Sequence, residues 1–378
     1  MSAAHAHIPA PKGLKVLLVA PTPPPSGGMA LQAQTLARML KEEGVQVSVV
    51  SANPSLPAWL GPLNRIPGVR TVIRTVTFAR TLAGCADGGV DVVHIFAASW
   101  VYFFSIVYPA IFIGRWKRAR VVLNYRGGDA GRFFARFRPV LSKAFRTADV
   151  ITAPSQFLAS LIQKEYHSSV AIVPNILDGS LFQYREPGIL RPRILATRHL
   201  EKMYDVESVV RAFELIQQRH PDASLTIAGS GSQEHILRAM VLALRLQNVQ
   251  FIGQVAHADM PGVYKQCDIL VNASRVDNFP AALVEASGAG LVIVSTCAGG
   301  IPVFYESGKN AMLVEPGDWR GLAAAVEELL EAPDKALRLI RNARSLILSC
   351  EWSEVRLALY SAYDIPARQR FCVGQEVN

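Results

Sequence analysis

Residues 269–296 have the sequence ILVNASRVDNFPAALVEASGAGLVIVST. Two apolar runs, at 269–272 and 291–296, have the length and the β-branched content of buried strands. Between them, Pro280 is well suited to the first position of a helix, and the Asp-Asn pair shortly before it can supply the cap. The stretch therefore predicts a strand, a helix and a second strand in one parallel sheet.

The same alternation extends along the chain in both directions. Further strand-like runs lie at 14–20, 45–51, 90–96, 121–124, 150–153, 193–197, 225–228 and 249–252. Proline and glycine crowd residues 174–193, which is typical of a linker. We therefore expect two doubly wound, Rossmann-like α/β domains at residues 1–183 and 184–351, with ligands bound in a cleft at the carboxyl ends of the strands.

Residues 92–114 contain no Asp, Glu, Lys or Arg, and the segment is long enough to cross a bilayer. His94 and Pro109 interrupt it, and its first residues alone make a strand. We therefore expect a strand followed by a buried or surface-lying helix rather than a membrane span.

Cysteine usage indicates the cellular setting. The five cysteines are odd in number and scattered, and no pair has the spacing of metal ligands or of a disulfide framework. The first fifteen residues lack the apolar core of a signal peptide. We expect a cytoplasmic protein and no metal site.

Charge is distributed unevenly. The net charge is +12 over residues 1–185 and −3 over residues 186–378, which together give the +9 of the whole chain. Residues 132–146 interleave arginines with aromatic side chains on an expected helix. That pattern fits nucleic acid, an anionic membrane surface, or a basic helix whose aromatic side lies in the core. We expect peripheral membrane association and no nucleic-acid partner.

The helix that begins near Pro280 offers a binding site. We expect the backbone N–H groups of Ala281 and Ala282 to be free at its start and to bind an anion such as a diphosphate. Asp277 and Glu285 flank this helix start, and each carboxylate can accept paired hydrogen bonds from sugar hydroxyl groups. Spacing alone also fits a capping aspartate and an ordinary helix glutamate.

Three segments together give a more specific signal: 277–288, then TCAGGIP at 296–302, then ESGKNAMLVEPGD at 306–318. They resemble, in order and interval, the C-terminal domain of family 4 glycosyltransferases of the GT-B fold. The resemblance runs from about Arg193 to Leu330 and is weaker over the N-terminal half. It implies transfer from a nucleotide sugar with retention at the anomeric carbon. It also implies that residues 352–378 pack back on the first domain.

The resemblance assigns roles to four catalytic residues. In the family's Glu-x7-Glu pair the first acid contacts the donor sugar and the second contacts the ribose. Asp277 and Glu285 match these positions, with Asp277 one methylene shorter. Arg198 matches the arginine that neutralises the diphosphate, and His94 resembles a histidine near the reacting sugar.

Other positions match the donor and acceptor sites of the family. Lys202 stands one position earlier than the family's diphosphate lysine, and Arg126 stands where many relatives have histidine and resembles an acceptor contact. The remaining donor-binding candidates are Gly27, Gly28, Gly229, Gly231, Phe279, Pro280 and Ala281.

These observations predict a retaining, metal-independent hexosyltransferase that uses no cofactor. No Asp-x-Asp occurs in the chain to hold a metal-bound diphosphate. A UDP-sugar is the favoured donor. The basic first half favours a lipid-linked or polysaccharide acceptor at the inner face of the membrane. A GT-B sugar-nucleotide epimerase and a catalytically degenerate binding subunit are the alternatives.

Overall fold

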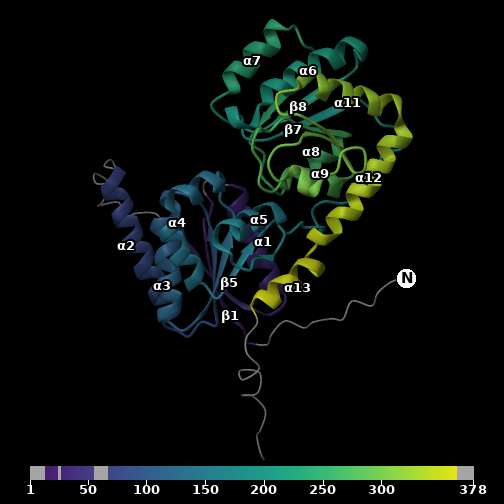
Figure 1. Ribbon diagram of the computed structural model, residues 1–378. Helices are drawn as coiled ribbons and strands as arrows, with labels where there is room; N and C mark the ends of the chain where they lie inside the picture. The colour runs from purple at the N-terminus through teal and green to yellow at the C-terminus, as the bar shows by residue number, and fades with distance from the viewer. Residues whose placement is uncertain (1–12, 24–26, 55–66, 364–378) are drawn as a thin grey trace, which may run out of the picture. The chain divides into compact units, whose positions relative to one another are not determined.

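The computed structural model describes residues 13–23, 27–54 and 67–363, which form two compact units (Figure 1). Unit 1 comprises the chain up to Ile176 together with the residues from Trp352 onward, and unit 2 comprises Leu177–Glu351. The division lies before the boundary expected from the sequence, because Leu177 and Phe182 pack in a core of unit 2. Each unit is an α/β fold with one parallel sheet.

The sheet of unit 1 has the strand order β2-β1-β3-β4-β5-β6, and all its neighbouring strands are parallel. Its strands are β1 Lys15–Ala20, β2 Gln46–Ser51, β3 Val92–Ala97, β4 Arg120–Tyr125, β5 Val150–Ala153 and β6 Ala171–Ile172. Its helices are α1 Gly28–Glu42, α2 Pro67–Ala86, η2 Phe103–Val107, α3 Tyr108–Trp116, α4 Ala130–Thr147, α5 Gln156–Tyr166 and α13 Trp352–Ala362.

Alternate side chains of the unit 1 strands enter two separate cores. Leu17 and Val93 face the core formed with α2, η2, α3, α4 and α5. Val16 and Leu18 face the opposite core, which α1 and α13 cover. The period of two follows from the pleat of the strand, so both faces of the sheet are buried and the runs are apolar throughout.

Helix α13 joins unit 1 from the far end of the chain. Its residues Val355 and Leu359 are buried in the same core as the β1 residues Val16 and Leu18. Polar contacts reinforce the packing: within unit 1, the carboxylate of Glu43 accepts hydrogen bonds from Trp352 Nε1 at 2.7 Å, from Arg356 at 3.1 Å and from the Tyr360 hydroxyl.

The charge-free segment at 92–114 forms strand β3, the π-helix η2 and helix α3. In the part of the chain that the structure describes, no helix combines the length and the apolar character needed to cross a membrane. The expectation of a strand followed by a buried or surface-lying helix is confirmed.

The aromatic residues of 132–146 point mainly into the protein. Phe133 and Phe134 of α4 are fully buried, whereas Arg132 and Arg136 are exposed. The helix bends at Phe137, whose φ is −124°, because Pro139 removes one backbone N–H and its ring clashes with the preceding turn. This is the arrangement of a basic helix with its aromatic side in the core.

The sheet of unit 2 has the strand order β12-β11-β10-β7-β8-β9, again parallel. Its strands are β7 Arg193–Thr197, β8 Ser224–Ala228, β9 Val249–Gly253, β10 Ile269–Asn272, β11 Val292–Thr296 and β12 Met312–Val314. Its helices are η3 Lys202–Tyr204, α6 Val206–Arg219, α7 Glu234–Ala243, α8 Met260–Gln266, α9 Ala281–Ala289, α10 Ile301–Phe304, α11 Trp319–Glu331, α12 Pro333–Ile347 and η4 Leu348–Cys350.

The order of the strands positions the candidate site. β7 and β10 lie side by side in the middle of the sheet, so the residues that follow them emerge at the same edge. The strand–helix–strand unit of residues 269–296 is present as β10, α9 and β11.

Candidate functional site

An ion pair lies at the carboxyl ends of the central strands of unit 2. Arg198 follows β7, and its Nη2 donates to Oδ2 of Asp277, which follows β10. Arg198 Nε also donates to Oδ1 of Asn272 at 3.1 Å. Asp277 Oδ1 accepts from the backbone N–H of Phe279 at 3.1 Å. Both oxygens of Asp277 therefore have protein partners, and the carboxylate fixes the direction of the guanidinium.

The start of α9 differs from the sequence prediction in three respects. Pro280 precedes the helix rather than opening it, and no side chain caps the helix. The N–H of Ala281 is not free, because it donates to the carbonyl of Phe279 at 2.9 Å. Of the two backbone N–H groups expected to be free, that of Ala281 is therefore already used, because the backbone makes a tight turn before the helix begins. Phe279 itself is buried and packs against Phe304.

Glu285 lies on α9 and is held by two side chains of unit 2. Its Oε1 is 3.2 Å from Nε2 of His257, and its Oε2 accepts from the hydroxyl of Tyr264 at 3.0 Å. The hydrogen bond to Glu285 raises the pKa of His257, which favours the imidazolium form. Burial raises the pKa of Tyr264 well above its usual value, so this hydroxyl stays a donor.

His257 was not predicted as a site residue, because it is a single histidine in the loop between β9 and α8. Asn272 and Tyr264 were also missed. Asn272 carried a usable signal, because it is a polar residue that ends an otherwise apolar strand. Such residues stand at the carboxyl edge of a parallel sheet, where ligands bind.

The glycine loop after β8 packs against the residues that carry Arg198. Gly229 has a φ of +147°, and a Cβ there would lie 2.0 Å from the carbonyl oxygen of Arg198. Gly231 follows in the same loop beside the backbone of Leu200. On the other side, Gly299 has a φ of +55°, and a Cβ there would lie 2.1 Å from the carbonyl oxygen of Asp277. Both partners of the ion pair thus have a glycine against their backbone.

Lys202 lies in η3 and its side chain is exposed. Among the described residues it makes no side-chain hydrogen bond and no ion pair. The ring of Tyr204, in the same turn, lies 5.4 Å from the guanidinium carbon of Arg198. Lys202 is thus an exposed cation close in sequence to the ion pair.

His94 of unit 1 is completely buried in β3. Its Nδ1 is 2.7 Å from the Tyr363 hydroxyl, and its Nε2 is 3.1 Å from Nδ2 of Asn124. Burial, with a smaller contribution from the charge of Arg126, lowers the pKa of His94 to about 3. The ring is therefore neutral, and both nitrogens have protein partners in this structure.

Arg126 follows β4 and is half-buried. It donates to Oδ1 of Asn175, and its guanidinium lies 4.4 Å from the ring centre of Phe96. Burial lowers the pKa of Arg126 to about 9. Its Nε and Oδ1 of Asn124 are buried without a hydrogen-bond partner among the described residues. Both side chains line the same small cavity of unit 1.

Gly27 and Gly28 stand at the start of α1. Among the described residues, no atom lies within 4 Å of a Cβ placed at either position, so no described part of the chain crowds this helix start.

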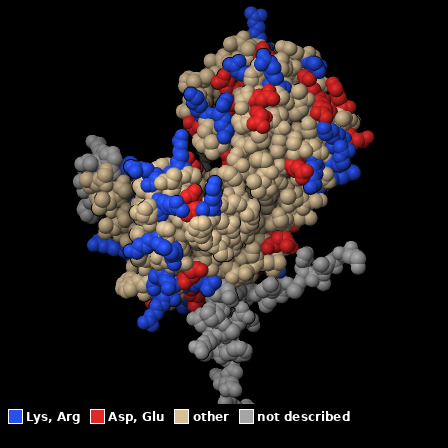
Figure 2. All heavy atoms as spheres, viewed as in Figure 1, with Lys and Arg blue, Asp and Glu red and all other residues tan. Residues whose placement is uncertain are grey.

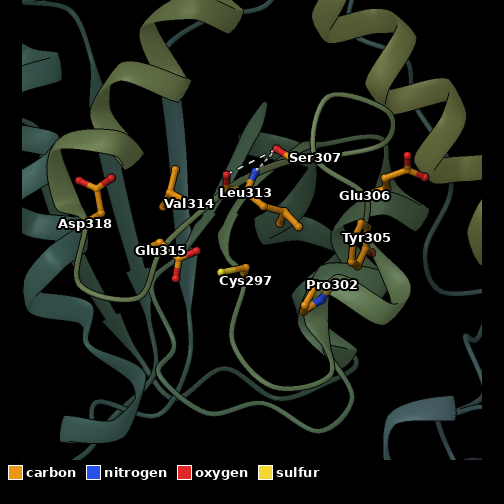
Figure 3. Close-up of a pocket in the computed structure, with 9 residues that line it drawn as sticks. All are labelled: Cys297, Pro302, Tyr305, Glu306, Ser307, Leu313, Val314, Glu315 and Asp318. Carbon is orange, nitrogen blue, oxygen red and sulfur yellow. Dashed lines mark hydrogen bonds between the residues drawn. The ribbon is translucent and has the colours of Figure 1, made fainter.

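A pocket of about 580 Å³ lies at the ends of β11 and β12 (Figure 3). It is lined by Cys297, Pro302, Tyr305, Glu306, Ser307, Leu313, Val314, Glu315 and Asp318. None of the site residues expected from the sequence lines it. Burial and a hydrogen bond to Glu315 raise the pKa of the Cys297 thiol, so this thiol is less reactive than a free one. Within the described ranges, no group of three or more His, Cys, Asp or Glu side chains could hold a metal ion.

Comparison with known proteins assigns the class. Residues 190–346 match the family described as Glycosyl transferases group 1, and residues 26–180 match Glycosyltransferase Family 4. The chain belongs to the family 4 glycosyltransferases and has the GT-B fold; it is a glycosyltransferase.

Three proteins illustrate the similarity. Glycogen synthase of Mycobacterium tuberculosis is 26% identical over 288 residues, which is 72% of this chain and 68% of that protein. The phosphatidylinositol N-acetylglucosaminyltransferase GPI3 subunit of Saccharomyces cerevisiae is 30% identical over 182 residues, 46% of this chain and 38% of the subunit. The structure of Anabaena Alr3699/HepE in complex with UDP superposes with a TM-score of 0.70 at 18% identity, covering 92% of this chain and 98% of that one.

Proposed function

We propose that this glycosyltransferase moves a sugar from a nucleoside diphosphate sugar to an acceptor hydroxyl. The observation that carries the proposal is the pair of oriented side chains in unit 2. Arg198 is a cation held by Asp277 and Asn272, and Glu285 is a carboxylate held by His257 and Tyr264. A leaving diphosphate needs a cation in a fixed place, and a ribose needs a carboxylate acceptor.

In this proposal Arg198 stabilises the negative charge that develops on the diphosphate as the sugar departs, and Lys202 is free to add a second positive charge. Glu285 accepts hydrogen bonds from the ribose. The Asp277 carboxylate keeps Arg198 oriented, and it would have to exchange a present partner to reach the sugar. No metal ion and no cofactor enter the proposed reaction.

We propose a UDP-sugar as the donor, supported by the UDP bound in the related HepE structure. Retention at the anomeric carbon comes from the family resemblance. We propose a lipid-linked or polysaccharide acceptor and a position on the inner face of the membrane. The phosphatidylinositol substrate named for the yeast relative and the basic charge of the N-terminal half support these choices.

The test is a panel of UDP-, GDP- and ADP-sugars incubated with the purified full-length protein. Release of the nucleoside diphosphate from one sugar nucleotide, lost in Arg198→Ala and in Glu285→Ala, is the expected result. Near-normal turnover in either variant would refute the assigned site. Conversion of the donor into an epimer without transfer would favour an epimerase instead.

A further inference from the structure

Helices α2, α3 and α4 and the π-helix η2 cover one face of the unit 1 sheet (Figure 1). Helix α3 contacts both α2 and α4. Their inward side chains form an aromatic core with Phe78, Phe103, Phe133, Phe134 and Phe145, all buried. The outward side chains of the same helices form a surface that we call the α2–α4 face.

The α2–α4 face exposes large apolar side chains in rows. On α2, Val69, Val72 and Val76 lie at helical spacing on one side and are 37%, 62% and 44% exposed. On the neighbouring α3, Phe112 and Trp116 are one turn apart and 39% and 70% exposed. Single exposed apolar residues are ordinary, but aligned rows on adjacent helices mark an interaction surface.

The charges of this face have one sign. Helices α2, η2, α3 and α4 contain no Asp and no Glu. Their basic residues are Arg70, Arg74, Arg80, Arg115, Arg132, Arg136, Arg138, Lys143 and Arg146. Figure 2 shows Lys and Arg gathered over unit 1 with few acidic side chains among them.

Several of these cations are free to act on a partner. In the described part of the chain, three of them pair with a carboxylate, namely Arg115, Arg132 and Arg138, and six have none within ion-pair distance: Arg70, Arg74, Arg80, Arg136, Lys143 and Arg146. The ammonium of Lys143 lies 5.8 Å from the ring centre of Phe112. That of Lys117, which pairs with Asp87, lies 4.1 Å from the ring of Trp116. Each exposed aromatic ring of α3 therefore has a cation beside it.

We propose that the α2–α4 face docks unit 1 on an anionic phospholipid surface. Valine rows and aromatic rings enter the boundary between headgroups and acyl chains, while the arginines and lysines remain at the level of the phosphates. Nucleic acid fits this surface less well, because the valines of α2 offer neither stacking rings nor hydrogen bonds to bases. The choice of a lipid as the partner rests on the lipid-linked acceptor of the proposed function. The evidence for an interaction surface on these helices does not depend on that function.

The experiment measures binding of the full-length protein to phosphatidylcholine vesicles with and without phosphatidylglycerol. We expect binding only to the anionic vesicles, with an affinity that falls as salt is added. Each Arg→Gln change at Arg132, Arg136 and Arg146 should lower the partition coefficient about fivefold. Combined Val72→Ser and Trp116→Ser should lower it at least about tenfold.

A matched control is available on α7 of unit 2, where Ile236 and Leu242 are 44% and 77% exposed. The combined Ile236→Ser and Leu242→Ser variant should bind vesicles like the wild type. All variants should keep the wild-type melting temperature and donor turnover, because the changed side chains are exposed and outside the candidate site.

Three results would overturn the proposal. The first is equal binding of the wild type to anionic and neutral vesicles at low salt. The second is wild-type binding by the α2–α4 variants. The third is that an RNA or DNA strand displaces the protein from the vesicles and binds more weakly to the same variants than to the wild type. Donor turnover is measured without vesicles, so failure of the proposed reaction is seen separately from failure of docking.

Discussion

Arg198 and Asp277 follow the neighbouring strands β7 and β10, and the guanidinium of the first donates to the carboxylate of the second. The side chains are 17% and 6% exposed, so water competes little with the pair. An arginine held in this way keeps its direction before a substrate binds. Stabilisation of the negative charge on a leaving diphosphate is stronger when the cation is already in place.

Replacing Arg198 by Ala should lower kcat for donor turnover about 100- to 1000-fold. Asp277→Asn should cause a smaller loss, because the guanidinium remains but is no longer held by a charge. The double variant should be scarcely worse than Arg198→Ala alone, since Asp277 is expected to act through Arg198. Steady-state kinetics of the three variants measure this. Losses that simply multiply would instead mean that Asp277 contacts the substrate itself.

Asp277→Ala should also destabilise unit 2 by about 3 kcal/mol, because it leaves a largely buried arginine without its counter-ion. Urea unfolding of the variant measures the change. Arg211→Ala is a suitable control, because its pair with Glu207 is exposed and lies within a single helix. A loss no larger than that of the control would contradict the importance of the buried pair.

His257 and Glu285 give a pH-dependent contribution to stability. The folded-state pKa of His257 is raised above 6.5 by its hydrogen bond to Glu285. The stabilisation by the protonated His257 is therefore fully present below the unfolded-state pKa of 6.5, and it is lost as the pH rises through the higher pKa of the folded state. The difference in unfolding free energy between the wild type and His257→Gln should be larger at about pH 6 than at about pH 9. An equal difference at both values would count against the pairing.

His94 should show the opposite dependence. Its pKa in the folded protein is lowered to about 3, so the native state keeps the ring neutral while the unfolded chain takes up a proton below 6.5. The stability from the neutral ring is present above pH 6.5 and is lost progressively toward pH 3. His94→Gln should flatten the fall in stability over this range. Thermal melts at a series of pH values measure it, and an unchanged slope would refute the assignment.

Gly229 and Gly27 form a matched pair for substitution. Gly229→Ala places a methyl group against the carbonyl of Arg198 at a positive φ, so we expect a loss of more than about 2 kcal/mol and reduced donor turnover. Gly27→Ala enters open space at an ordinary φ and should cost about 1 kcal/mol or less. Denaturant unfolding compares the two. Similar losses at both positions would contradict the close contact at Gly229.

The architecture was accessible from the sequence because strands buried on both faces are continuous apolar runs, such as 14–20 and 291–296. Local geometry was less accessible. The helix α9 begins one residue later than Pro280 indicated, because Ala281 bonds to Phe279 before the first full turn. His257 stood alone in a loop, and only the tertiary fold brings it to Glu285.

Spacing also could not show that Arg198 and Asp277 would pair. They are 79 residues apart, and their contact depends on the order of the strands in the sheet. The family resemblance assigned Arg198 to the diphosphate and Asp277 to the sugar. The folded chain links the two groups directly, so changes at either position are expected to affect both.

Helix α13 has a consequence for the biosynthesis of the protein. Val355 and Leu359 complete the core beneath α1, yet they are made after every residue of unit 2. The ribosome therefore releases unit 2 in full while the first half of the chain still lacks part of its interior. A nascent or truncated chain ending near Glu351 would expose the apolar side of α1 and Val16, and would present a hydrophobic surface to chaperones and proteases.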